Sequence, residues 1–237
     1  MASSGSSVAV IPVHNEAPTT GIIVAVARVY LPVIVVDDAS DDGSGPLAAA
    51  TGATMLTLSK HQGKGAALRY GFAEAWRRGA EAVVTLDGDG QHDPHDIPRL
   101  LAASQRWPKS IIIGGCLDAA AEIPRHRLHA IRVASFWLNW LGGCSIQDTQ
   151  SGFCVYPTAM PRSLPLRHGG FLLESEVLLK AAQAGCDIRE LPIRAIYRSD
   201  QRSQYRSLWD GMTAATYLLY HGIRFWLRQS RQREDMP

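Results

Sequence analysis

The first half of the chain alternates short, continuously apolar runs with stretches of helical pattern. Apolar runs without polar alternation are typical of strands that are buried on both faces of a parallel sheet. The expected strands cover residues 8–13, 33–36, 55–58, 81–84 and 111–113, and the expected helices between them cover residues 22–30 and 65–78. This order predicts an α/β fold, in which a mostly parallel sheet carries helices on both faces.

The second half is less regular. We expect a helix over residues 125–141, a short strand over 154–156, a helix that ends at Ala184 and a last strand over 188–196. Pro192 removes a hydrogen-bond donor from this last strand, which favours a place at a sheet edge. The helix over 125–141 is rich in aromatic residues. Core packing is the more common reason for such a stripe, and an apolar face toward lipid is the alternative.

Polar and acidic residues directly follow three of the expected strands. Asn15 and Glu16 follow the first, Asp37 and Asp38 follow the second, and residues 87–93 follow the fourth. In a parallel sheet the ligand-binding crevice lies outside the carboxyl ends of the strands. We therefore expect these side chains to converge on one rim of the sheet.

The segment after the fourth strand holds two carboxylates, Asp87 and Asp89, with Gly88 and Gly90 allowing a tight turn. Two adjacent carboxylates repel each other, and burial of either without a partner is unfavourable. Mg²⁺ or Mn²⁺ would resolve this, because such ions take oxygen ligands from one or two carboxylates and leave positions for substrate phosphates. The alternative is an ordinary polar turn after a strand.

Two common phosphate-binding loops are absent, since no G-x-G-x-x-G follows the first strand and no G-x-x-x-x-G-K-[ST] occurs. Lys64 lies between Gly63 and Gly65 at the start of an expected helix. Its ammonium group and the neighbouring amides could contact a phosphate, and a solvated helix cap is the alternative.

Charge is distributed unevenly along a chain whose net charge is only +2. Eight Arg against four acidic residues from Arg194 onward make the tail basic, and the acidic rim argues against a nucleic-acid partner there. The four cysteines form no C-x-x-C pair and are expected to be free thiols in a reducing compartment. Without a recognisable signal peptide or an apolar run of about 20 residues, the folded part is expected to be cytoplasmic.

Four sequence blocks stand in order along the chain, at residues 11–16, 36–44, 86–91 and 148–153. This ordered set resembles the family 2 glycosyltransferases of GT-A (Rossmann-like) fold, especially the dolichol- or polyprenyl-phosphate sugar transferases. The likeness runs over residues 8–197, so we expect a GT-A domain at 1–200 and a basic amphipathic C-terminal helix at 201–237.

The resemblance implies an inverting, metal-dependent transfer of a sugar from a nucleotide-diphosphate sugar to a lipid-linked or other apolar acceptor. The implied donor-binding residues are Pro12, Asn15, Glu16, Asp38, Lys64, Asp87 and Arg202. The implied ligands of Mg²⁺ or Mn²⁺ are Asp87, Asp89 and Gln91, and the implied catalytic residues are Asp89 and Asp148. Asp148 is the candidate general base near the acceptor, and the alternative for it is a turn-forming residue.

Two positions depart from the family pattern, because Cys116 and Cys154 stand where relatives usually carry Arg. Arg grips phosphate with two parallel hydrogen bonds and Cys cannot, so the acceptor need not be a polyprenyl phosphate. Arg198, Arg202 and Arg206 could compensate, or could form a merely solvated loop. A sugar-nucleotide pyrophosphorylase and a non-catalytic nucleotide-sugar-binding module remain the alternatives.

The tail beyond residue 201 carries apolar and aromatic residues at roughly helical spacing, with Arg at its end. Such a helix can lie in a membrane interface, which predicts peripheral attachment at the inner face of the membrane. Packing against the domain is the alternative.

Overall fold

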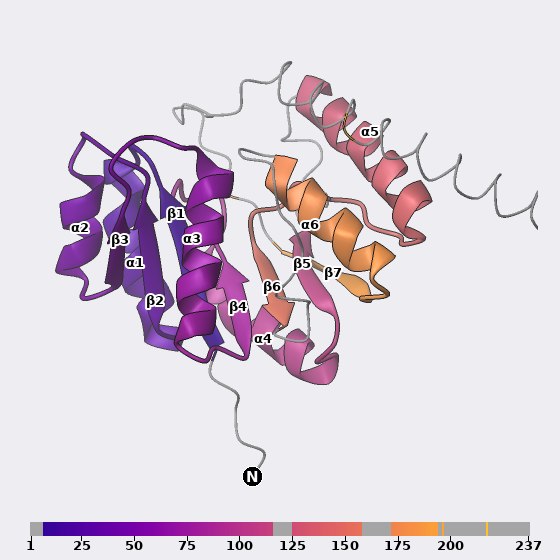
Figure 1. Cartoon of the computed structure of the whole chain (residues 1–237), viewed down its shortest axis with the longest axis horizontal. Coiled ribbons are helices and arrows are strands. Elements are labelled where there is room, and N and C mark those ends of the chain that lie inside the picture. Colours follow the sequence, from indigo (N-terminus) through magenta and orange to yellow (C-terminus); the bar gives the residue numbers. More distant parts are fainter. Residues whose placement is uncertain (1–6, 116–124, 158–171, 194–195, 197–216, 218–237) are drawn as a thin grey trace, which may run out of the picture.

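The computed structural model describes residues 7–115, 125–157, 172–193, 196 and 217 (Figure 1). The strands are β1 (Ser7–Val13), β2 (Val33–Asp37), β3 (Thr54–Thr57), β4 (Ala82–Thr85), β5 (Ile111–Gly115), β6 (Cys154–Pro157) and β7 (Ile188–Pro192). The helices are α1 (Ala17–Tyr30), α2 (Ser44–Ala50), α3 (Lys64–Arg77), α4 (Ile97–Arg106), α5 (Arg125–Gly142) and α6 (Leu172–Gln183), with a short 3₁₀ helix η1 (Pro94–Asp96).

All seven strands form one sheet, in the order β3-β2-β1-β4-β6-β5-β7. Every pairing is parallel except those of β6, which runs antiparallel to both β4 and β5. Because of this reversal, Cys154 at the start of β6 pairs with Thr85 at the end of β4. The loop before β6 therefore arrives at the same rim as the turn after β4.

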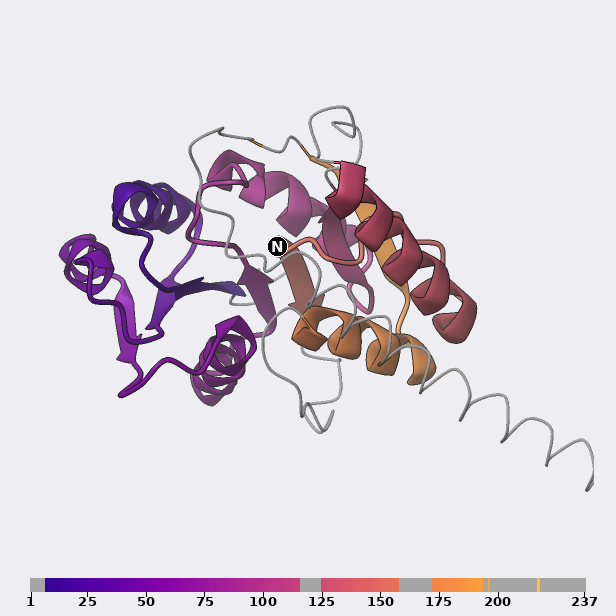
Figure 2. The ribbon, with the colours of Figure 1, turned by 90° about the horizontal axis from the view of Figure 1, so that it is seen from above.

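Two apolar cores lie on opposite faces of the sheet. Side chains of α3, α5 and α6 pack on one face and those of α1, α2 and α4 on the other, as the view from above also shows for α1, α3, α4 and α6 (Figure 2). Leu68 and Phe72 are buried and Trp76 stacks on Phe72 with 5.5 Å between ring centroids. The predicted α/β fold with both faces covered is confirmed, and α3 presents an apolar face to the sheet.

Several boundaries differ from the sequence-based expectations. Helix α1 begins at Ala17, five residues before the expected start, because Pro18 occupies its first turn, where its missing N–H has no cost. Helices α2 and α4 were not expected from the sequence. Strand β7 ends at Pro192 and lies at the sheet edge, as predicted.

Core packing holds for part of the aromatic helix α5, and another part of it is exposed; that the exposed part faces lipid stays a prediction. Ala134, Leu138 and Leu141 are buried in the core, whereas Phe136 and Trp140 are 63% and 53% exposed.

Some expectations fall outside the described residues, namely those for Cys116, Arg198, Arg202, Arg206 and all but one residue of the tail. Within the described ranges, Cys144, Cys154 and Cys186 are free thiols, as predicted. No described helix is long and apolar enough to cross a membrane.

Candidate active site

The ends of the parallel strands β1, β2 and β4 form the predicted polar rim. Val13, the last residue of β1, pairs with Asp37, the last residue of β2. Beyond this pair the two loops are joined by side chains: the N–H of Asn15 donates to Ser40 Oγ (3.1 Å), and the N–H of Asp41 donates to Asn15 Oδ1 (3.0 Å). Asn15 adopts a left-handed backbone conformation (φ 56°), which Asn tolerates better than most residues. Asn15 thus fixes the shape of the rim.

Asp38 is buried and orders the loop that leads into α3. Its Oδ1 accepts the N–H of Gln62 (2.7 Å) and its Oδ2 accepts the N–H of Gly63 (2.6 Å). His61 Nδ1 lies 3.0 Å from the same Oδ2, and the ring of His61 stacks on that of His14 with 4.0 Å between centroids. The carboxylate therefore holds the backbone just before Lys64. A contact between Asp38 and a nucleoside stays a prediction.

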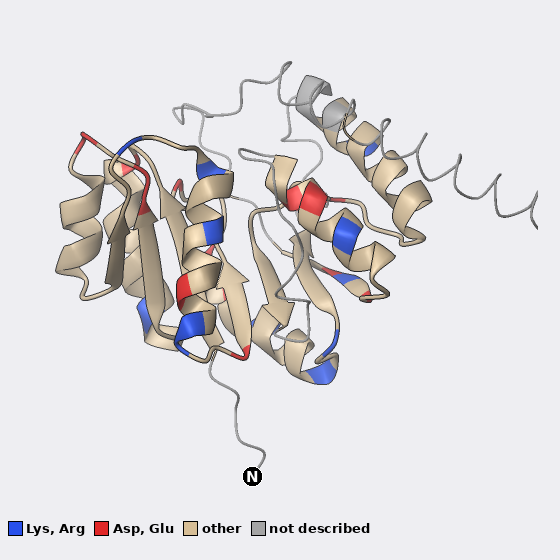
Figure 3. Cartoon of the chain, viewed as in Figure 1, with Lys and Arg blue, Asp and Glu red and all other residues tan. Residues whose placement is uncertain are grey.

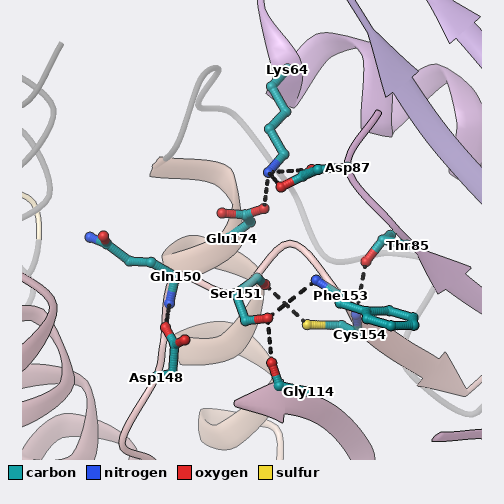
Figure 4. A network of polar contacts seen from close by, with 10 residues as sticks. All are labelled: Lys64, Thr85, Asp87, Gly114, Asp148, Gln150, Ser151, Phe153, Cys154 and Glu174. Atoms are coloured by element: carbon teal, nitrogen blue, oxygen red, sulfur yellow. Dashed lines mark hydrogen bonds and ion pairs between the residues drawn. The ribbon is translucent and has the colours of Figure 1, made fainter. Parts of the chain in front are cut away.

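Lys64 bridges two carboxylates that come from different halves of the fold (Figure 4). Its Nζ lies 2.7 Å from Asp87 Oδ1, at the end of β4, and 2.7 Å from Glu174 Oε1, on α6. All three side chains are largely buried, with exposed fractions of 18%, 21% and 5%. Burial alone would lower the pKa of Lys64, but the two carboxylates raise it well above its usual value. Lys64 therefore carries a permanent positive charge at the rim.

Glu16 adds a further carboxyl group to this cluster. Burial, followed by the negative charges of Asp89 and Asp87, raises the pKa of Glu16 from 4.5 to about 9. Its buried Oε2 has no hydrogen-bond partner among the described residues and lies 2.5 Å from the place that a Cβ on Gly88 would take. The carbonyl oxygen of Pro12, which is buried in β1, is 3.4 Å from that place. Glu16 is thus protonated at neutral pH and packs against the turn between the two aspartates.

The turn after β4 holds the residues expected to bind a metal. The N–H of Gln91 donates to Asp89 Oδ1 (2.9 Å), and the carbonyl of Gln91 accepts the N–H of Ile196 (2.8 Å). Within the described part of the chain, no group of three or more His, Cys, Asp or Glu side chains could hold a metal ion by itself. A cation at this turn would take ligands beyond these described side chains, and Mg²⁺ and Mn²⁺ commonly take them from water and from substrate phosphates.

The loop before β6 brings Asp148 into the same region. Asp148 is buried, and its Oδ1 accepts the N–H of Gln150 (3.2 Å). Its negative charge contributes to the raised pKa of Glu174, after burial and the charge of Asp87. A side chain at Gly152 would collide with the carboxylate of Asp87, so only Gly lets this loop approach so closely. The reversal of β6 thus joins the Asp148 loop to the Asp87 turn.

Cys154, where an Arg was expected, lies inside the fold. Its Sγ donates to the carbonyl of Ser151 (3.3 Å), and burial raises the pKa of the thiol. Figure 4 shows this thiol beside the loop and apart from the Lys64 bridge. Cys154 is therefore an inert, structural thiol.

Glu174 is a site residue that was not predicted from the sequence. It lies in the first turn of α6, where the ribbon shows acidic residues at the start of the helix (Figure 3). Burial raises the pKa of Glu174, and its Oε2 has no hydrogen-bond partner among the described residues. The available signal was a pair of acidic residues at the start of an otherwise apolar helix. Its ion-pair partner, Lys64, is far from Glu174 in the sequence, so this signal could not predict the pairing.

Comparison with known proteins identifies the family of this chain. The family model described as Glycosyl transferase family 2 matches residues 8–160, which is more than half of the 237 residues. The chain belongs to glycosyl transferase family 2. The resemblance found in the four sequence blocks is thereby confirmed.

Two relatives in this family are similar over most of their length. An undecaprenyl-phosphate mannosyltransferase of Micrococcus luteus is 27% identical over 208 residues, covering 80% of this chain and 83% of the relative. A polyprenol monophosphomannose synthase of Mycolicibacterium smegmatis is 28% identical over 199 residues, covering 78% of this chain and 75% of the relative.

The fold is similar to that of a solved glycosyltransferase. Glucosyl-3-phosphoglycerate synthase from Mycobacterium tuberculosis, in complex with phosphoglyceric acid, gives a TM-score of 0.73 at 19% identity and covers 92% of this chain and 80% of that chain. The same enzyme in complex with Mn²⁺, uridine diphosphate and phosphoglyceric acid gives a TM-score of 0.69 at 18% identity, with 93% and 78% covered. The likeness confirms the GT-A fold of this family 2 member.

Proposed function

We propose that this glycosyltransferase transfers a sugar, with inversion, from a nucleoside-diphosphate sugar to a polyprenyl-phosphate-like acceptor. The observation that carries the proposal is the cluster of buried and half-buried ionisable side chains near the ends of β1 and β4, namely Glu16, Lys64, Asp87, Asp89 and Glu174. It is supported by the names of the two relatives, which act on undecaprenyl phosphate and on a polyprenol.

The donor diphosphate would lie over this cluster. Lys64 offers a fixed positive charge, and its partner Asp87 holds that charge at the end of β4. Asp89 and Gln91 would hold Mg²⁺ or Mn²⁺ together with diphosphate oxygens, and the bound cation would neutralise the charge that grows on the leaving group. The incomplete set of ligands among the described residues fits this role, because the substrate would supply further ones.

The transfer step forms one bond and breaks another at the anomeric carbon. An acceptor oxygen attacks from the face opposite the diphosphate, and the electron pair of the broken bond leaves with the diphosphate. If the acceptor is a hydroxyl group, Asp148 would take its proton. A phosphate acceptor has an ionised oxygen that can attack without a base, and while it keeps one proton its P–OH group could donate a hydrogen bond to Asp148, which would orient it.

The experiment that tests this proposal is a thermal-shift screen combined with a transfer assay. Because the described residues offer no complete ligand set to a cation, Mn²⁺ alone and a nucleoside-diphosphate sugar alone should each raise the apparent Tm little. Both together should raise it by several degrees, since only the ternary complex is tight. The screen should compare UDP-, GDP- and dTDP-sugars.

The matching donor should then transfer its sugar to a polyprenyl phosphate, with release of a nucleoside diphosphate and loss of activity in EDTA. Release of pyrophosphate would instead indicate a pyrophosphorylase. Binding without turnover would indicate a non-catalytic module, and either result would overturn the proposal.

We also propose that the enzyme attaches peripherally to the cytoplasmic membrane face. Exposed apolar side chains on α5 support this: Val133, Phe136 and Trp140 are 47%, 63% and 53% exposed and recur at helical spacing, with exposed Arg132 beside them. Aromatic side chains edged by Arg are typical of helices that lie in the membrane interface. The basic C-terminal segment, residues 201–237, is proposed to add electrostatic attraction to anionic lipid.

Flotation with vesicles tests this attachment. Replacing Phe136 and Trp140 together by Ser should lower the vesicle-bound fraction on anionic vesicles by about tenfold, because two exposed aromatic groups would no longer enter the interface. A matched control replaces Ile22 and Val29, which are 68% and 76% exposed on α1, by Ser. Equal binding by both double variants would contradict a role for α5.

A further inference from the structure

Glu190 on the edge strand β7 reaches the loop that carries Asp148. Its Oε2 accepts the N–H of Gln147 (2.8 Å), and its Oε1 accepts the N–H of Asp148 (3.0 Å). Hydrogen bonds to an ionised carboxylate are stronger than neutral ones. Two such bonds from successive amides to one carboxylate fix both the position and the orientation of the peptide that bears Asp148.

The sheet leaves a place for this side chain. Strand β7 pairs with β5 so that Glu190 lies opposite Ile113, and Gly115 follows two residues later on the same face of β5. A Cβ at Gly115 would collide with Glu190 Oε1 and would lie 2.7 Å from its Cδ. Glu190 therefore lies across Gly115, and this glycine lets the carboxylate extend to the loop.

Other elements hold the neighbours of Asp148. From α5, Ser135 Oγ donates to the carbonyl of Gln147 (2.8 Å), and Asn139 exchanges hydrogen bonds of 2.8 and 2.9 Å with the backbone of Ile146. From the other side, Ser151 Oγ donates to the carbonyl of Gly114 (2.5 Å). These bonds anchor the flanks of the loop, whereas the amide of Asp148 itself donates to Glu190.

We infer that Glu190 is a positioning residue, which acts on transfer by holding the backbone of Asp148 in the orientation that the acceptor requires. The inference rests on the proposed function, in which Asp148 acts on the acceptor. The proposed donor residues that the structure describes lie on β1, after β1 and β2, at the start of α3 and in the turn after β4, and none of them bonds to Glu190. Loss of the Glu190 carboxylate should therefore affect turnover and leave donor binding unchanged.

Replacement of Glu190 by Gln tests this. A Gln side chain can accept only one of the two amides, and its NH₂ group opposes the other. We expect kcat to fall by about 10- to 100-fold, since small misplacements of a reacting group have effects of this size, and the KM for the donor to stay within about twofold. The matched control is Asp187→Asn, because Asp187 precedes β7, is 54% exposed and bonds to Arg189 and Ser110 and not to the loop.

A double-mutant cycle with Asp148→Asn separates positioning from general damage. If Glu190 acts through Asp148, the double variant should be no slower than Asp148→Asn alone, within about twofold. If the two effects multiply, or if Asp148→Asn turns over normally while Glu190→Gln is slow, the inference is overturned. Normal turnover of Asp148→Asn also contradicts the proposed role of Asp148, and so the two failures are distinguishable.

A second variant keeps the test valid if Glu190→Gln folds poorly. Gly115→Ala keeps the carboxylate but displaces it from the loop, and it should give the same loss of kcat, again absent in the Asp148→Asn background. The thermal shift with donor and Mn²⁺ identifies folded, donor-competent protein in each case. An unchanged kcat in a folded Gly115→Ala or Glu190→Gln variant would overturn the inference.

Discussion

Replacing Asp89 by Asn is expected to lower the rate of sugar transfer by at least about 10²-fold, the usual effect of losing one charge-stabilising group at a reaction centre. The substitution is local, because Asn retains the Oδ1 that accepts the N–H of Gln91 (2.9 Å) and so preserves the turn. What disappears is the negative charge that would bind the cation. Initial rates at saturating donor, measured over a range of Mn²⁺ concentrations, report this loss.

The matched control lies four residues further on. Asp93 Oδ1 accepts the N–H of His95 (3.0 Å) in a turn of the same kind, and its side chain is 41% exposed. Asp93→Asn therefore makes the same chemical change outside the charge cluster and should leave the rate within about twofold. A normal rate and an unchanged Mn²⁺ requirement in Asp89→Asn would contradict the assignment of this residue to the metal.

The position of the rim could be predicted from the sequence, because it depends only on the direction of the strands. Continuously apolar runs joined by helices make β1, β2 and β4 parallel, and parallel strands place Asn15, Asp38 and Asp87 at one edge. The groups that each carboxylate binds could not be predicted. Asp38 accepts the amides of residues 62 and 63, a contact that depends on how the following loop folds back over it.

The position of the Asp148 loop could not be predicted, because it depends on the direction of one short strand, β6. The four residues of β6, Cys154–Pro157, are apolar and buried in a way that fits either a parallel or an antiparallel strand. The antiparallel choice brings the Asp148 loop to the Asp87 turn, where Gly152 is required for the close approach. Neither Glu174 as the partner of Lys64 nor Glu190 as the partner of Asp148 follows from spacing along the chain.

The two missed helices differ in what their sequences offered. Helix α4 carries Ile97, Leu100 and Ala103 at helical spacing, all buried, and this pattern could have been recognised. Helix α2 has only seven residues and includes Gly45, which lies so close to Asp37 that a Cβ there would be 2.6 Å from its Oδ2. Tertiary contact therefore overrides its weak helical propensity.

Replacing Lys64 by Met should lower the free energy of unfolding by about 3–5 kcal/mol, the usual consequence of removing one partner from a buried ion pair. Lys64 Nζ lies 2.7 Å from both Asp87 and Glu174, and Met fills a similar volume without the charge. Two carboxylates would then remain buried without their cation. Urea unfolding in EDTA, without nucleotide, measures this change separately from any effect on donor binding.

The stability of Lys64→Met should fall as the pH rises. Glu174 already has a pKa raised above 4.5 by burial, so its contribution to stability is fully present below 4.5 and is lost as the pH rises toward that raised pKa. Without Lys64 the pKa of Glu174 should rise further, and the decline in stability should extend to higher pH. Unfolding curves of Lys64→Met between about pH 5 and 8 should therefore show a steeper loss than those of the wild-type protein.

A second substitution tests whether unpaired charge is the cause. Adding Glu174→Gln to Lys64→Met removes one of the two stranded carboxylates, so about half of the lost stability should return and the pH dependence should flatten. The control is Arg77→Met, because Arg77 is 69% exposed in its pair with Glu74, and solvent-exposed ion pairs contribute little to stability. Two results would contradict this explanation: a loss of stability in Lys64→Met no larger than in this control, or no recovery of stability on adding Glu174→Gln. Either would mean that the Lys64 ammonium group does not stabilise the buried carboxylates.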